Sequence, residues 1–251
     1  AAFTPWKLQR KAKHFFLGFF GFTVALFIGL RHEVGNDWFH YLDYYNGLLK
    51  TNLYDALFTY EPGYVFINWV CSQTNFGIYG VNLLCAIIFT YGLIFFCKSQ
   101  IYPWISLGIA MPFIGIVFAM GATRQSAALG FVYIAIKYLM QGSRTKYFIF
   151  ICLAITFHKT AIIMMPFGII GGRNNKLRYQ FMFVLLFLIA IWLFWEKFEN
   201  YYLYYVKSHK ILYGELLYSY GGRTRVWMNV VPVLLYFLLS NNKALFKEQG
   251  G

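Results

Sequence analysis

Carboxylates gather in one short segment of a basic chain. The sequence holds 22 Lys and Arg residues against 9 Asp and Glu residues. More than half of these acids lie within residues 31–63, namely Glu33, Asp37, Asp43, Asp55 and Glu61. An ionised carboxylate can accept the proton of a hydroxyl group as a general base. A solvated helix face accounts for Asp43 and Asp55, and helix capping accounts for Glu61, so Glu33 and Asp37 are the stronger candidates for chemistry.

Arginines are placed where two helices are predicted to begin. In "GATRQSAALG" Arg124 follows a glycine turn and a capping Thr123, and in "GGRTRVW" Arg223 and Arg225 follow a glycine pair. A cation in the first turn opposes the helix dipole. The placement is favourable when the free N–H groups and the guanidinium bind one anion together. These arginines therefore predict an anion site, and snorkelling to the membrane surface is the alternative.

A histidine and a lysine interrupt a long apolar stretch. His158 and Lys159 lie in the middle of residues 147–170, and Thr160 can cap the short helix that follows them. Charge at such a depth is costly and usually faces a cavity or a partner. Because His158 titrates near neutral pH, it is a second candidate base. A structural histidine is the alternative.

The composition predicts a membrane protein built from helices. Hydrophobic residues make up 59% of the chain and charged residues 12%, about half the charged share of soluble domains. We expect an all-α polytopic protein with a single integral membrane domain over 1–251. The apolar segments long enough to cross are 15–30, 77–97, 103–121, 125–140, 179–195 and 226–240. The four cysteines lie within apolar runs and are expected to be buried free thiols.

Two further apolar segments are too short to cross alone. Residues 62–73 give roughly 18 Å of helix, whereas a bilayer core is about 30 Å thick. We interpret 62–73 as a half-helix. Residues 147–170 are interpreted as a hairpin with His158 and Lys159 at its tip, and the alternative for them is one continuous helix. This arrangement collects most Lys and Arg residues inside, as the positive-inside rule requires. It places 31–61, 122–124, 158–159 and 196–225 outside, where they would form a cleft.

An amphipathic helix is predicted at the membrane interface. Gly35 and Asn36 can form a turn and cap, with Asp37 near the helix start. Aromatic and aliphatic residues then recur at helical spacing, at Trp38, Tyr41, Leu42, Tyr45, Leu48 and Leu49. Asp37, His40 and Tyr44 are expected to share the opposite face. Such a helix lies with its aromatic side chains at headgroup depth.

The order of these motifs resembles the EpsG branch of the Wzy-type bacterial polysaccharide polymerases. The motifs are Arg31 with "VGND", then "EPGY", "RQSAALG", "FHKTA" and a late "GGRTR". The resemblance runs over nearly the whole chain. Family members are commonly longer, which leaves open whether a C-terminal portion is missing here. The resemblance implies a multi-pass protein of the bacterial cytoplasmic membrane with its active site on the outer face.

The resemblance also implies a reaction and its partners. Such enzymes transfer a glycan from undecaprenyl pyrophosphate to the non-reducing end of another lipid-linked repeat unit, with no cofactor, metal or nucleic acid. Chain-length regulators and flippases are expected protein partners. We assign Arg124, Lys159, Arg223 and Arg225 to the pyrophosphate and Tyr44, Tyr45 and Glu61 to the glycan. His158 and Asp37 are equally favoured as the base, with Glu33 orienting Arg31.

Two other functions fit the same residues. A flippase or another transporter of lipid-linked oligosaccharide also has charges within the membrane and broken helices. The sequence has no evident internal repeat, and its charges gather on one face instead of lining a path. A membrane acyltransferase that modifies glycans could use His158 as its base. The substrate separates these functions, because a polymerase needs a lipid-linked glycan and no acyl donor.

Overall fold

The computed structural model describes residues 10–35, 37–59, 61–74 and 76–170. All regular structure in these residues is helical. They belong to one compact unit that ends at Arg173. The predicted spans 179–195 and 226–240, together with Arg223 and Arg225, lie outside the described residues. The helical fold class is confirmed for the described part of the chain.

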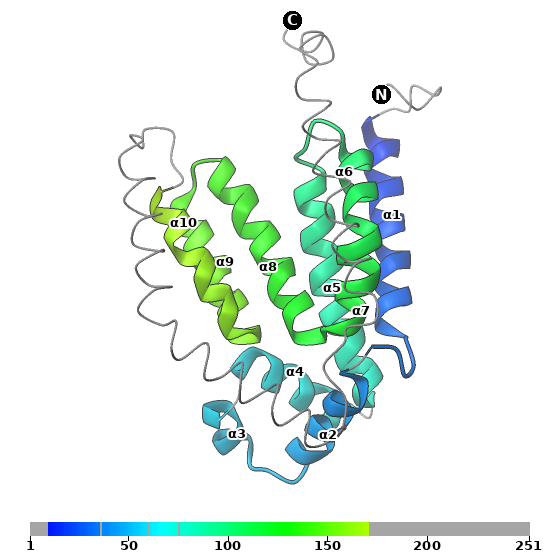
Figure 1. Cartoon of the computed structure of the whole chain (residues 1–251), viewed down its shortest axis with the longest axis vertical. Coiled ribbons are helices and arrows are strands. Elements are labelled where there is room, and N and C mark those ends of the chain that lie inside the picture. The colour runs from blue at the N-terminus through cyan, green and yellow to red at the C-terminus, as the bar shows by residue number, and fades with distance from the viewer. Residues whose placement is uncertain (1–9, 36, 60, 75, 171–251) are drawn as a thin grey trace, which may run out of the picture. The chain divides into compact units, whose positions relative to one another are not determined.

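Four helices pack into a bundle. They are α1 (Arg10–Gly29), α5 (Gly77–Cys97), α8 (Thr123–Met140) and α9 (Arg144–Phe157). Helix α5 packs against both α1 and α8, and α9 covers the other side of α8 (Figure 1). Of the described helices, two are long and apolar enough to cross a membrane: α5, and the rod Pro103–Gly121. Crossing by 15–30 and 125–140, which lie in α1 and α8, stays a prediction.

The Pro103–Gly121 rod is irregular in its middle. It consists of α6 (Pro103–Ala110), the π-helical segment η1 (Met111–Phe118) and α7 (Ala119–Gly121). Pro112 cannot donate a backbone hydrogen bond and clashes with a regular preceding turn. The wider π-helical turn relieves this conflict. The sequence pattern predicted the ends of this rod correctly but not its irregularity.

Three short helices gather at one end of the bundle (Figure 1). They are α2 (Trp38–Leu48), α3 (Leu53–Thr59) and α4 (Pro62–Gln73). Gly35, with a φ of 98°, turns the chain beside Met120 and Gly121, so α1 ends and α8 begins at this same end. The bounds of α4 equal those of the predicted half-helix, with Pro62 in the first turn. Because Arg124 lies in the first turn of α8, we call this end of the bundle the Arg124 end.

The chain reverses its direction at His158. This residue is extended (φ −156°, ψ 120°) and ends α9. The short helices η2 (Lys159–Met164) and α10 (Met165–Ile170) then return along α9. The Tyr147 hydroxyl donates to the Met164 carbonyl, and a Cβ on Gly168 would lie 2.5 Å from the Tyr147 ring. The hairpin is therefore confirmed, and the continuous helix is wrong.

The sidedness of the bundle can be measured by cysteine labelling. Of the native cysteines, Cys71, Cys85 and Cys97 are buried, whereas Cys152 is exposed, contrary to our expectation. In a Cys152→Ser background, we expect Asp43→Cys to react with an impermeant maleimide from outside intact cells. Gln141→Cys, at the opposite end, should react only after permeabilisation. The reverse pattern would overturn the predicted topology.

Candidate active site

An arginine and a glutamate from distant parts of the chain form an ion pair at the Arg124 end. Arg124 is the second residue of α8, and Glu61 directly precedes α4. The Arg124 Nη1 atom lies 3.0 Å from the Glu61 Oε2 atom, and the side chains are 26% and 17% exposed. The Glu61 side chain does not cap α4, so our capping interpretation was wrong. Its carboxylate neutralises the cation that begins α8.

Tyrosine rings surround the Arg124 guanidinium. Its central carbon lies 5.6 Å from the Tyr41 ring centroid and 5.7 Å from those of Tyr44 and Tyr64. These distances allow cation–π attraction, which strengthens where water is excluded. Tyr64 is fully buried and Tyr44 is half-buried against it. Tyr44 and Tyr41 thus both pack on Tyr64, whereas we expected them on opposite faces of α2. The rings hold the guanidinium in one place.

His158 lies close to this ion pair. A Cβ on Gly63 would lie 2.5 Å from the Thr156 Oγ1 atom, so the start of α4 touches the end of α9 beside His158. Burial lowers the pKa of His158 below 6.5; Glu61 opposes this shift, while Arg124 and Lys159 reinforce it. The buried Nδ1 atom has no hydrogen-bond partner among the described residues. Arg124 thus acts electrostatically on His158, and the Lys159 side chain is exposed; a shared role of these residues at a pyrophosphate stays a prediction.

A cavity of about 200 Å³ adjoins His158. Its polar lining includes Gln125, His158 and Thr160, and its apolar lining includes Leu129, Val132 and Met164. Thr160 does not cap η2, because His158 is the residue before that helix. The cavity lies between α8 and the hairpin. A polar reacting group and an apolar chain could both be accommodated near His158.

Arg31 is buried inside the protein. It is 6% exposed, which excludes snorkelling to a surface. Its Nη1 atom donates to the Ile28 carbonyl at 2.8 Å and its Nη2 atom to the Thr123 hydroxyl at 2.6 Å. The Thr123 hydroxyl in turn donates to the Asn82 Oδ1 atom at 3.3 Å. Thr123 is the first residue of α8 and does not cap it. Arg31 therefore connects α1 and α5 to the start of α8 and positions Arg124.

Removing the Thr123 hydroxyl is expected to destabilise this connection. Thr123→Val keeps the shape of the side chain but leaves a buried arginine donor unsatisfied, which costs about 1–3 kcal/mol. Thermal unfolding of the purified protein in detergent measures the loss. Thr123→Ser retains the hydroxyl group and should unfold close to the wild-type temperature. Equal stability of Thr123→Val and the wild type would exclude a structural role for the bond.

The first-loop acids are exposed. Glu33 has a positive φ of 51°, and its carboxylate lies 3.6 Å from the Nε2 atom of His32. No ion pair joins it to Arg31 in the described part of the chain, so the prediction that Glu33 orients Arg31 is wrong. Asp37 precedes α2 without capping it through its side chain. It lies near enough to Tyr41 to raise the pKa of that hydroxyl, after the larger effect of burial.

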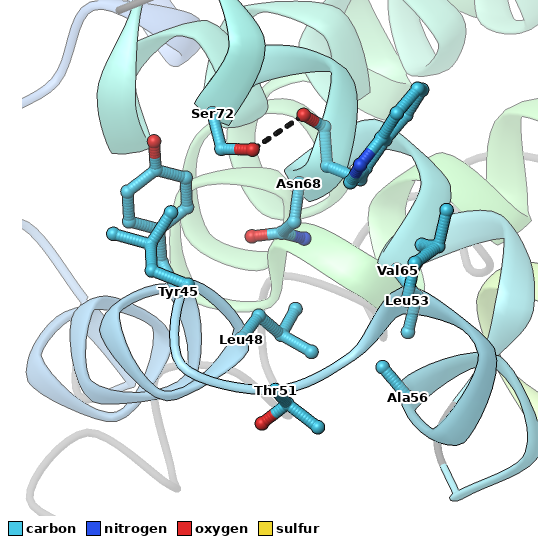
Figure 2. Close-up of a pocket in the computed structure, with 10 residues that line it drawn as sticks. Tyr45, Leu48, Thr51, Leu53, Ala56, Val65, Asn68 and Ser72 are labelled. Atoms are coloured by element: carbon cyan, nitrogen blue, oxygen red, sulfur yellow. Dashed lines mark hydrogen bonds between the residues drawn. The ribbon is translucent and has the colours of Figure 1, made fainter.

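Tyr45 faces a different pocket. This pocket lies between α2, α3 and α4, and Figure 2 shows Tyr45, Leu48 and Asn68 among the residues around it. The Ser72 hydroxyl donates to the Trp69 carbonyl at 2.6 Å beside it. The pocket measures about 30 Å³, which is enough for one water molecule. A glycan contact by Tyr45 stays a prediction and is not supported by this geometry.

Sequence reasoning missed part of this site. It did not pair Glu61 with Arg124, and it treated Tyr41 and Tyr64 only as an interfacial ring and a motif residue. A signal for this pairing was present in the sequence. Glu61 of "EPGY" and Arg124 of "TRQS" have opposite charges, stand at two helix starts, and were placed on the same side by the predicted topology. Asn82 gave no signal, because an asparagine within an apolar helix can have many partners.

The described residues form a helical bundle with two helices long and apolar enough to cross a membrane and a half-buried ion pair at one end. A family model described as "EpsG family" matches residues 14–249. The chain belongs to the EpsG family, which associates it with polysaccharides at a membrane. No curated protein and no solved structure matches the chain.

Proposed function

We propose that the protein is a polysaccharide polymerase of the bacterial cytoplasmic membrane. It transfers a glycan from undecaprenyl pyrophosphate to the non-reducing end of a second lipid-linked repeat unit. The observation that supports this proposal is an Arg124–Glu61 ion pair that acts electrostatically on His158, which lines a cavity, in a chain of the EpsG family. A cation for a leaving phosphate and a proton acceptor for a hydroxyl are the groups that this transfer needs.

The reaction exchanges one bond at the anomeric carbon. The acceptor hydroxyl oxygen forms a bond to this carbon, and the bond from the carbon to the pyrophosphate oxygen breaks. The electron pair leaves with undecaprenyl pyrophosphate, where Arg124 stabilises the charge without a metal. Lys159, Arg223 and Arg225 are proposed to assist it. The hydroxyl proton passes to the base.

His158 and Asp37 are the proposed alternatives for this base. His158 lines the cavity and is influenced electrostatically by Glu61 and Arg124, whereas Asp37 is exposed and influences Tyr41. The base variant should lose about 100- to 10,000-fold in turnover while it still binds the lipid-linked substrate. His158→Gln and Asp37→Asn, assayed for polymerisation and for binding, decide between them. Normal turnover in both variants would exclude both residues.

The pH dependence gives a second test of His158. A base must be neutral to accept a proton, and burial lowers the pKa of His158 below 6.5. The ratio kcat/KM, which reports the free enzyme, should therefore fall only at a pH below the ordinary titration range of a histidine, as the imidazole becomes protonated. The residual activity of His158→Gln should lack this acidic limb. An unchanged limb in that variant would assign it to another group.

Reconstituted protein tests the proposed function against its alternatives. In vesicles that contain the lipid-linked repeat unit, a polymerase should lengthen the glycan on the carrier lipid. A transporter would move the repeat unit between leaflets at constant length. An acyltransferase would need an added acyl donor. Movement at constant length, or dependence on such a donor, would overturn the proposal.

A further inference from the structure

We propose that Glu61 occupies the place of a donor phosphate on Arg124, and that donor binding transfers this carboxylate to His158. The inference rests on the proposed function and deepens it. It makes Glu61 a positioning residue that links arrival of the donor to activation of the base. Nothing in the family match assigns a role to Glu61.

The Arg124 guanidinium could bind a phosphate group, and in this structure a carboxylate occupies that position. Guanidinium groups bind carboxylates and phosphates through the same planar set of donors. The Arg124 Nη1 atom lies 3.0 Å from the Glu61 Oε2 atom. Neither side chain is fully buried, so an incoming anion can reach the pair. A pyrophosphate carries more negative charge than a carboxylate and can displace it.

The guanidinium stays in place when its partner changes. The rings of Tyr41, Tyr44 and Tyr64 lie 5.6–5.7 Å from its central carbon. The preceding residue, Thr123, is fixed by its hydrogen bonds to Arg31 and Asn82. Glu61, in contrast, lies on the extended residue before α4, and its side chain makes no capping bond. The carboxylate is therefore the partner that is free to move.

His158 offers the displaced carboxylate a new partner. The start of α4 packs on the end of α9, directly before His158. The buried Nδ1 atom of His158 has no partner among the described residues. A carboxylate that accepts a hydrogen bond from one imidazole nitrogen orients the ring and strengthens the other nitrogen as a base. In the donor-free protein Glu61 binds Arg124, and a phosphate that takes its place there releases the carboxylate for His158.

The charged groups around His158 agree with this exchange. Glu61 faces it from the start of α4, Arg124 from α8, and Lys159 follows it in η2. Without donor, Arg124 neutralises Glu61 and the imidazole is a weak base. With donor, the phosphate neutralises Arg124, and the carboxylate acts on His158 alone. Proton transfer thus becomes efficient only when a donor is bound, which protects the acceptor hydroxyl from unproductive chemistry.

Binding of undecaprenyl pyrophosphate tests the exchange. The probe is the carrier lipid without a glycan, titrated into the purified full chain in nanodiscs. Glu61→Gln should bind it several-fold more tightly than the wild type, because the competing carboxylate is gone. The same variant should lose about 100-fold or more in polymerisation. Asp43→Asn, which removes an exposed carboxylate of α2, is the matched control and should change neither quantity.

Lipid binding and polymerisation together distinguish the proposed exchange at Glu61 from a merely structural ion pair. A structural pair would loosen Arg124 when broken, so the carrier lipid would bind more weakly. Unchanged or weaker binding by Glu61→Gln, or normal turnover, would overturn the inference. Glu61→Asp, which keeps the charge, should recover part of the turnover and serves if Glu61→Gln does not fold. If the wild type fails to polymerise while Glu61→Gln binds the lipid more tightly, competition between Glu61 and phosphate for Arg124 stands, whereas the proposed function and the activation of His158 fail.

Discussion

Arg124→Gln is expected to reduce polymerisation by about 100- to 1,000-fold, the usual cost of removing one preorganised donor from a developing charge. The departing pyrophosphate loses the cation that stabilises its charge, and the donor-free protein loses the partner of the Glu61 carboxylate, which is 17% exposed. Arg124→Lys keeps the charge but not the planar set of donors, so its loss should be smaller but clear. Turnover of purified lipid-linked repeat units measures both.

A cation at the far end of the same helix provides the control for Arg124. Lys137 lies in the last turn of α8, with its Nζ atom 3.3 Å from the Phe95 ring centroid. Lys137→Gln changes the net charge of the protein by the same amount as Arg124→Gln. It should keep nearly full turnover. Full activity of Arg124→Lys and Arg124→Gln would show that the ion pair serves only the fold.

Gly130→Val is expected to prevent correct packing of α5 against α8. A Cβ on Gly130 would lie 2.5 Å from the Ile88 carbonyl oxygen, and a Cβ on Gly92 would collide with the Gly130 carbonyl. Because the obstructing atoms belong to the backbone, they cannot move as a side chain would. Overpacking usually costs about 1–3 kcal/mol, and this clash should exceed that range. A monodisperse peak in size-exclusion chromatography should disappear.

Gly18→Ala is the matched control for that substitution. Gly18 lies within α1, and nothing is within 4 Å of its added Cβ. Alanine favours a helix over glycine by about 1 kcal/mol, so the variant should be as stable as the wild type or more so. A monodisperse Gly130→Val protein with wild-type unfolding temperature would mean that α5 and α8 do not approach each other this closely.

Local signals were sufficient to predict most of the helix ends. Pro62 can begin a helix but cannot continue one, and the 12 residues of α4 are too few to cross a bilayer. The charge at His158 and Lys159 likewise predicted the reversal between α9 and η2. These signals act within a few residues, so a single sequence contains them.

The partners of polar side chains were not predictable in this way. Glu61 and Thr123 both stand at helix starts, where capping is the usual local role. In each case a distant arginine is the actual partner, since Arg124 lies 63 residues from Glu61 and Arg31 lies 92 residues from Thr123. A charge-assisted bond to a guanidinium is stronger than a neutral capping bond. Tertiary packing therefore overrode the local preference.

The face of a helix was also misassigned where the helix has more than one neighbour. Helical spacing grouped Tyr44 with Asp37 and His40 on the face opposite Trp38 and Tyr41. Helix α2 contacts both α4 and α5, so its buried surface is wider than one stripe. Tyr44 packs against Tyr64 of α4, with ring centroids 5.4 Å apart. Periodicity predicts one face, and the number of neighbours decides how far that face extends.

The most direct test of the proposed reaction is its stoichiometry. Purified wild-type protein is incubated with its lipid-linked repeat unit and a metal chelator, without an acyl donor. The new glycosidic bonds and the released undecaprenyl pyrophosphate are then measured in the same sample. The account predicts one undecaprenyl pyrophosphate released for each new glycosidic bond, with the glycan growing on the remaining carrier. Carrier release without chain growth, or unchanged chain length with the substrate bound, would contradict it.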